Sequence, residues 1–116
     1  MPHLRPIGSV GPMLRRAVEF MRENLERPLS LDDIAEAVER SPSQLARQFR
    51  AGLGTPPHQY LLVLRIKHAQ QLLRETVQPI AEIAVASGFS HQEHMTRMFR
   101  RLGDTTPAAY RRAFQN

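Results

Sequence analysis

Apolar side chains recur every three or four residues along most of the chain, which is the spacing of amphipathic helices. The stretches between these runs carry Pro, Gly, Ser or Thr, which can end one helix and begin the next. We count seven such runs, and no segment alternates apolar and polar residues with a period of two. The pattern therefore predicts an all-α protein with about seven helices and no strands.

Residues suited to cap a helix mark several of the expected boundaries. The predicted N-caps are Ser30, Ser41, Ser90 and Thr106. The first helix is expected over residues 12–26, and Gly52 and Gly54 are expected to end the third. The longest helix follows Thr55-Pro56-Pro57 and runs to about residue 76, so it spans about 28 Å.

The two halves of the chain repeat each other. Ile34-Ala35 corresponds to Ile83-Ala84, and Ser41 corresponds to Ser90, both at a separation of 49 residues. Phe49-Arg50 corresponds to Phe99-Arg100 at a separation of 50, which gives the second half one extra residue after its turn. Each half reads as a short helix, a tight turn and a longer helix, the arrangement of a helix-turn-helix motif.

This repeat predicts the organisation of the chain. We expect a linker or flexible arm over residues 1–11 and a first helix-turn-helix subdomain over 12–56. A connecting helix should occupy 57–76, and a second helix-turn-helix subdomain should occupy 77–116. Successive major-groove faces of B-DNA lie about 34 Å apart, so the connecting helix has a length suited to two DNA-reading units.

The exposed faces of the two longer motif helices carry side chains that can read DNA. In the major groove Arg binds guanine and Gln binds adenine through paired hydrogen bonds. The base-reading candidates are Ser43, Gln44, Ala46 and Arg47 in the first motif and Gln92, Glu93, His94 and Arg97 in the second. The candidates for contact with the DNA backbone, which fixes position without reading sequence, are Ser30, Arg50, Arg65, Lys67, Pro79, Arg100 and Arg111.

Composition supports this interpretation weakly and narrows the alternatives. The net charge is +5, and fifteen of the sixteen basic residues are Arg. No cysteine is present, which excludes disulfides and thiolate zinc sites. His91 and His94 lack an evident third metal ligand, and no Gly-rich phosphate loop occurs, so we expect no enzyme activity, metal or cofactor. No apolar run is long enough to span a membrane, and the expected location is cytoplasmic.

Two rival interpretations stay open at this point. The same helices could form a protein-interaction module that never binds DNA. A metal-dependent enzyme would instead need stoichiometric metal at His91 and His94. The acidic residues Asp32, Asp33, Glu36 and Glu39 could form either a solvated face or a contact with the transcription machinery.

From Met13 to Phe114 the chain resembles the DNA-binding domain of AraC/XylS-type bacterial transcription regulators. The residues that carry the resemblance are Pro79 to Ala84, Gly88-Phe89-Ser90, Thr96 to Arg101, Thr106-Pro107, Tyr110-Arg111 and, for the connecting helix, Leu64-Arg65-Ile66, Ala69 and Leu72-Leu73. Met95 stands where the family often has Phe, and Asp104 stands where many members have Gly.

The resemblance implies seven helices, promoter binding and transcription control, usually activation, with RNA polymerase as a candidate protein partner. It also implies base-reading roles for Ser43, Ala46 and Arg47 and for Gln92, Glu93 and Arg97. Most members carry an effector-binding or dimerisation domain, and none is present in this sequence. The linker-like first eleven residues favour the C-terminal part of a longer regulator over a stand-alone one.

Overall fold

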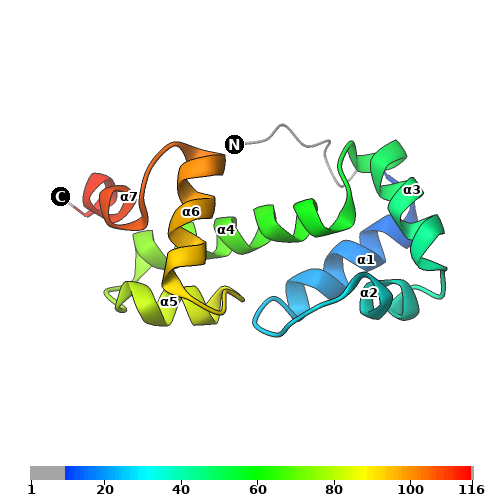
Figure 1. Cartoon of the computed structure of the whole chain (residues 1–116), viewed down its shortest axis with the longest axis horizontal. Coiled ribbons are helices and arrows are strands. Elements are labelled where there is room, and N and C mark those ends of the chain that lie inside the picture. The colour runs from blue at the N-terminus through cyan, green and yellow to red at the C-terminus, as the bar shows by residue number, and fades with distance from the viewer. Residues whose placement is uncertain (1–9, 116) are drawn as a thin grey trace. The chain divides into compact units, whose positions relative to one another are not determined.

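The computed structural model describes residues 10–115 and is built there from α-helices alone (Figure 1). The helices are α1 (Pro12–Glu23), α2 (Leu31–Ala37), α3 (Pro42–Leu53), α4 (Pro57–Glu75), α5 (Ile80–Ala86), α6 (Gln92–Gly103) and α7 (Pro107–Phe114). The prediction of an all-α fold with about seven helices is confirmed. Most of the linker predicted over residues 1–11 lies outside the described part.

The described chain divides into two compact units, residues 10–62 and residues 63–115. The division falls inside α4, the helix predicted to connect the two motifs. The first unit contains α1, α2, α3 and the first turns of α4. The second contains the rest of α4 together with α5, α6 and α7.

The first unit buries the apolar faces of its helices against one another. Its fully buried large side chains include Met21, Ile34, Leu45, Phe49 and Leu53. The ring of Phe49 meets the ring of Tyr60 edge to face, with centroids 5.8 Å apart. This aromatic pair joins α3 to the first turns of α4 within the unit.

The second unit repeats that packing with different residues. Leu73, Ile83, Met95 and Phe99 are fully buried. The rings of Phe99 and Tyr110 meet edge to face with centroids 5.9 Å apart, and this pair joins α6 to α7. The start of α4 therefore has a counterpart in α7, since Tyr60 and Tyr110 are separated by the same 50 residues as Phe49 and Phe99.

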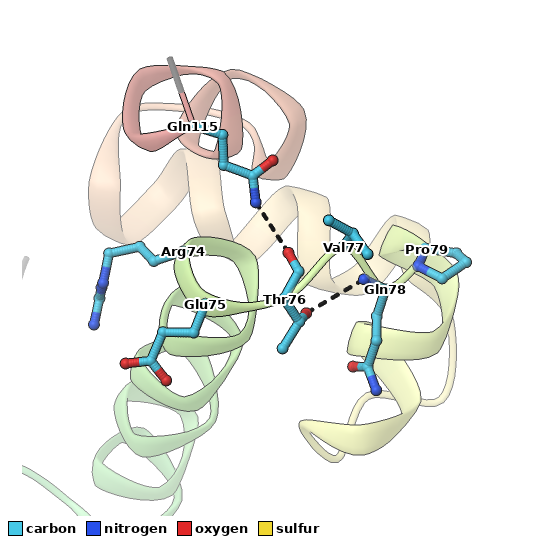
Figure 2. A pocket seen from close by; sticks show the side chains of 7 residues that line it. All are labelled: Arg74, Glu75, Thr76, Val77, Gln78, Pro79 and Gln115. Atoms are coloured by element: carbon cyan, nitrogen blue, oxygen red, sulfur yellow. Dashed lines mark hydrogen bonds between the residues drawn. The ribbon is translucent and has the colours of Figure 1, made fainter.

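The C-terminus of α7 is tied to the end of α4. The side-chain amide of Gln115 donates to the carbonyls of Leu73 and Thr76, at 3.0 and 2.9 Å. Figure 2 shows the bond between Gln115 and Thr76 beside an open hollow that residues 74–79 line together with Gln115. The carbonyl of Leu73 lies in the last turn of α4 and that of Thr76 follows the helix, so these bonds engage carbonyls that the end of the helix leaves without intrahelical partners.

Two helix ends differ from the sequence prediction. α1 ends at Glu23 rather than near residue 26, because Asn24 leaves the helical conformation and its side chain donates to the carbonyl of Phe20 at 2.8 Å. Gly52 lies inside α3, and Gly54 alone ends it in the left-handed conformation, with φ of 80°. The apolar spacing does not reveal the first difference, because Leu25 continues the pattern beyond the end of the helix.

Candidate nucleic-acid interface

Helix α3 presents a polar face above a fully buried apolar one. Leu45, Phe49 and Leu53 are buried, and the predicted reader Arg47 is exposed. The side chain of Ser41 accepts from the amide of Gln44 at 3.2 Å, and the Gln44 side chain accepts from the amide of Ser41 at 3.1 Å. This reciprocal capping box fixes the start of the helix.

The predicted base readers of α3 therefore differ in solvent exposure and in whether their side chains already form hydrogen bonds. Ser43 and Arg47 are exposed, and Ala46 is half-buried. The carbonyl end of Gln44 already accepts a hydrogen bond in the capping box. A paired contact between Gln44 and a base would have to share the side-chain oxygen with the capping bond, which an amide oxygen can do because it has two lone pairs. Arg47 has no competing hydrogen bond or ion pair among residues 10–115.

Helix α6 has the same buried face but a different start. Met95 and Phe99 are fully buried, and Gln92, Glu93 and Arg97 are exposed. The N-cap is His91, and its side chain makes no capping hydrogen bond. The prediction of Ser90 as the cap is wrong, because Ser90 lies in the turn before the helix.

The two turns explain the single extra residue of the second motif. Glu39 and Gly88 both have positive φ, 56° and 88°. The next amides, of Arg40 and Phe89, donate to the carbonyls of Ala35 and Ala84 at 3.0 and 2.9 Å. The motifs match up to these residues at a separation of 49.

Beyond the turns the separation is 50, because Ser90 is inserted before the N-cap of α6. This places Arg97 at the position of Arg47, and Thr96 at the position of Ala46. Thr96 is half-buried and was not among the predicted readers. Thr96 becomes a candidate reader only when the two motifs are aligned at a separation of 50, which the position of the inserted residue in the turn determines.

His94 occupies in α6 the position that Gln44 holds in α3. Its ring meets the ring of Phe89 edge to face, with centroids 5.3 Å apart. Partial burial lowers the pKa of His94, and the positive charges of Arg97, Arg65 and His91 lower it further. Arg97 and Arg65 thus bring positive charge close to the start of α6, where the carboxylate of Glu93 is also exposed.

The predicted DNA-backbone contacts fall into two groups. Arg50, Lys67 and Arg100 are exposed, and no partner is present for their charged ends among residues 10–115. Arg65 is half-buried, and this burial lowers the pKa of its guanidinium. Pro79 is the exposed N-cap of α5.

The other two predicted backbone contacts are engaged within their own unit. Arg111 donates from its guanidinium to the carbonyls of Leu73 and Thr76, at 3.4 and 3.3 Å. The Ser30 hydroxyl accepts from the amide of Asp33 at 3.0 Å. Hydrogen bonds from the amide and hydroxyl of Ser30 lower the pKa of Asp33, whose negative charge opposes a phosphate there. These arrangements favour structural roles for Arg111 and Ser30.

Residues 10–115 bring no three His, Cys, Asp or Glu side chains together in a way that could hold a metal ion. Within the same range no helix has both the length and the apolar character needed to cross a bilayer.

Comparison with known proteins identifies the class of this arrangement. The profile of a helix-turn-helix domain family matches residues 34–113. A crystal structure of a transcriptional regulator from Chromobacterium violaceum, described as an AraC-type DNA-binding domain-containing protein, is 42% identical in sequence. It superposes with a TM-score of 0.86 over 90% of this chain and 94% of that one. The chain belongs to the AraC-type helix-turn-helix domains.

Other transcription regulators are similar over most of the chain. The DNA-binding domain of AdpA, solved in complex with a target DNA, is 29% identical, with a TM-score of 0.84 over 91% of this chain and 95% of that one. The transcriptional regulator ArgR of Pseudomonas aeruginosa is 38% identical over 92% of this chain and 32% of its own length. The chain thus spans about a third of the curated relatives that it matches. The prediction of a DNA-binding transcription regulator is confirmed at the level of the family.

Proposed function

We propose that this chain binds duplex DNA with sequence preference and regulates transcription, with α3 and α6 each entering a major groove. The single observation that carries the proposal is the matched pair Arg47 and Arg97. Each guanidinium stands exposed two residues before a fully buried phenylalanine, at the same position of two equivalent helices. A helix that is anchored by one face and arginine-bearing on the other is suited to groove reading.

The remaining assignments follow from the exposure of each side chain. Arg47, Arg97 and Gln92 are the proposed main base readers. The proposed secondary base contacts are Ser43, Ala46, Glu93 and Thr96. Lys67, Arg50 and Arg100 are the proposed phosphate contacts. Because the two helices differ in every outward position except the arginines, one chain is expected to prefer an asymmetric site.

We further propose activation as the sign of regulation, RNA polymerase as the protein partner and the cytoplasm as the location. These extend what the resemblance to the family implies. AdpA was solved with its target DNA, and an equivalent complex is the expectation for this chain.

Selection from a random pool of duplex DNA, followed by fluorescence anisotropy on the enriched sites, tests the proposal. We expect an asymmetric consensus and an affinity that falls steeply with added salt, since each neutralised phosphate releases counterions. Lack of binding at low salt would instead favour the protein-interaction module.

A further inference from the structure

A cavity of about 250 Å³ lies within the first unit, where the start of α2, the middle of α3 and the start of α4 meet. We call it the α2–α4 cavity. Its apolar walls come from Leu29, Leu31, Ile34 and Leu61, together with two prolines. Leu31 is 38% exposed, so part of this apolar surface meets water when the cavity is empty.

The polar groups of the cavity are basic. Arg50 and His58 line it, and no Asp or Glu does. Both side chains are exposed, and the guanidinium of Arg50 makes no hydrogen bond or ion pair within residues 10–115. A guanidinium offers a planar fork of donors that matches a carboxylate. The cavity thus combines apolar walls with unengaged positive charge.

Two residues that line the cavity differ from their equivalents in the second unit. Ala46 lines it with a side chain of one carbon, and Leu61 completes its apolar wall. The equivalent positions of the second unit hold Thr96 and Arg111, and Arg111 is bonded to the end of α4. The repeat therefore does not require such a cavity, and the first unit has it because of its own sequence.

We propose that the α2–α4 cavity binds a small organic carboxylate with a compact apolar body. The apolar body would lie against the leucines and Ile34, and the carboxylate would accept hydrogen bonds from Arg50 and, where its ring nitrogen donates, from His58. Pockets for small ligands are lined in this way, by apolar walls with few polar groups that set orientation. This inference goes beyond DNA binding, since it gives the domain a ligand of its own.

Cyclohexanecarboxylate and its neutral amide, cyclohexanecarboxamide, are suitable probes because they share size and shape. Titration of the ¹⁵N-labelled chain, followed by amide chemical shifts, locates and measures binding without DNA. We expect saturable shifts in α2, α3 and the start of α4, with a dissociation constant of roughly 1 mM for so small a ligand. The amide should bind roughly fivefold more weakly.

Two variants separate the contributions of charge and space. Arg50→Gln should bring the acid to the affinity of the amide and leave the amide unchanged. Ala46→Leu should fill the cavity and weaken both probes at least tenfold. Arg100→Gln, which removes the equivalent charge from the second unit, is the matched control and should leave both affinities as they are.

Equal binding of acid and amide by the unaltered chain would overturn the proposal, as would shifts that map outside these helices or persist in Ala46→Leu. A further consequence rests on the proposed function, because Arg50 is also a proposed phosphate contact. Saturating carboxylate should weaken DNA binding about twofold to threefold. If the chain binds no DNA, the proposed function is wrong. The titration is performed without DNA and still tests whether the cavity binds a carboxylate.

Discussion

The two helix-turn-helix motifs share a packing scheme and differ in how their helices begin. In the first motif, α2 and α3 each start with a reciprocal capping box, built by Ser30 with Asp33 and by Ser41 with Gln44. In the second, neither Pro79 nor His91 caps its helix with a side chain. In α3 the capping box engages the side chain of Gln44 in the first turn. In α6 no capping hydrogen bond engages a side chain of the first turn.

We infer from this difference that a side chain engaged in capping is less available to DNA. The side-chain oxygen of Gln44 is engaged at the start of α3, whereas the pKa of His94, at the equivalent position of α6, is lowered by burial and by the charges of Arg97, Arg65 and His91. We infer that the first motif is the stiffer of the two and that the second carries more of the sequence reading.

The largest effect is expected from removing the aromatic anchor of each unit. Phe49→Ala and Phe99→Ala each delete a fully buried ring and should cost about 3–5 kcal/mol of unfolding free energy. Amide hydrogen exchange should show the loss mainly in the unit that carries the change. Equal loss of protection in both units for either variant would contradict the division at α4.

Changing the N-cap residues of α3 and α6 should alter the free energy of unfolding by about 1 kcal/mol, in opposite directions for the two helices. Ser41→Ala removes the capping bond of α3 and should lower its stability. His91→Ser supplies a cap that α6 lacks and should raise the stability of the second unit. Chemical denaturation measures both. A destabilising His91→Ser would mean that the imidazole holds the start of α6 in a way that a hydroxyl cannot.

Substitutions in the turns of the two motifs should change stability by a smaller amount. Glu39 has φ of 56°, where a side chain is strained, and the equivalent residue of the second motif is Gly88, with φ of 88°. Glu39→Gly should stabilise the first unit by about 0.5–1 kcal/mol, and Gly88→Ala should destabilise the second by about 1–2 kcal/mol. Thermal unfolding of both variants checks the pair, and a shift of the same sign in both would refute the equivalence of the turns.

The smallest effect is a difference in response to acid. Burial, with the charges of Arg97, Arg65 and His91, holds the pKa of His94 below its ordinary value of 6.5. The neutral ring is therefore favoured by folding, and its contribution to stability is complete above pH 6.5 and is lost as the pH falls through the lowered folded-state pKa. The first motif has Gln44 at this position and lacks the effect.

His94→Gln is the matched test of that difference, because it copies the first motif. Exchange protection of α6 should then stop declining on mild acidification, while α3 should behave as before. A decline that survives the substitution would have to come from another group.

How far the sequence predicts this molecule can be judged from particular residues. The caps Ser30, Ser41 and Thr106 are confirmed because a capping hydrogen bond is local, joining residues three apart. The placement of Ser90 as a cap is wrong, because its offset of 49 from Ser41 suggests the role while the inserted residue shifts the start of α6 to His91. The separation of 50 between Phe49 and Phe99 already reveals one extra residue, but only the structure places that residue before the N-cap of α6.

The candidate site shows the same limit. Exposure of Arg47 and Arg97 is predictable from helical spacing against Phe49 and Phe99. The engagement of Arg111 with the carbonyls of Leu73 and Thr76 is not, because residues more than thirty positions apart meet only in the folded unit. Spacing predicts which face a residue occupies, and long-range contacts decide whether its side chain is available.

Selection of random duplex DNA with Arg47→Ala and Arg97→Ala decides whether α3 and α6 read DNA. Arg16→Ala is the control for lost charge on an exposed face of α1. Each reader variant should bind the unaltered chain's site about 1–3 kcal/mol more weakly and should lose preference at its own, separate positions. Arg16→Ala should keep the full consensus. If both reader variants select the same consensus as the unaltered chain, with unchanged affinity, the claim that α3 and α6 read DNA is contradicted.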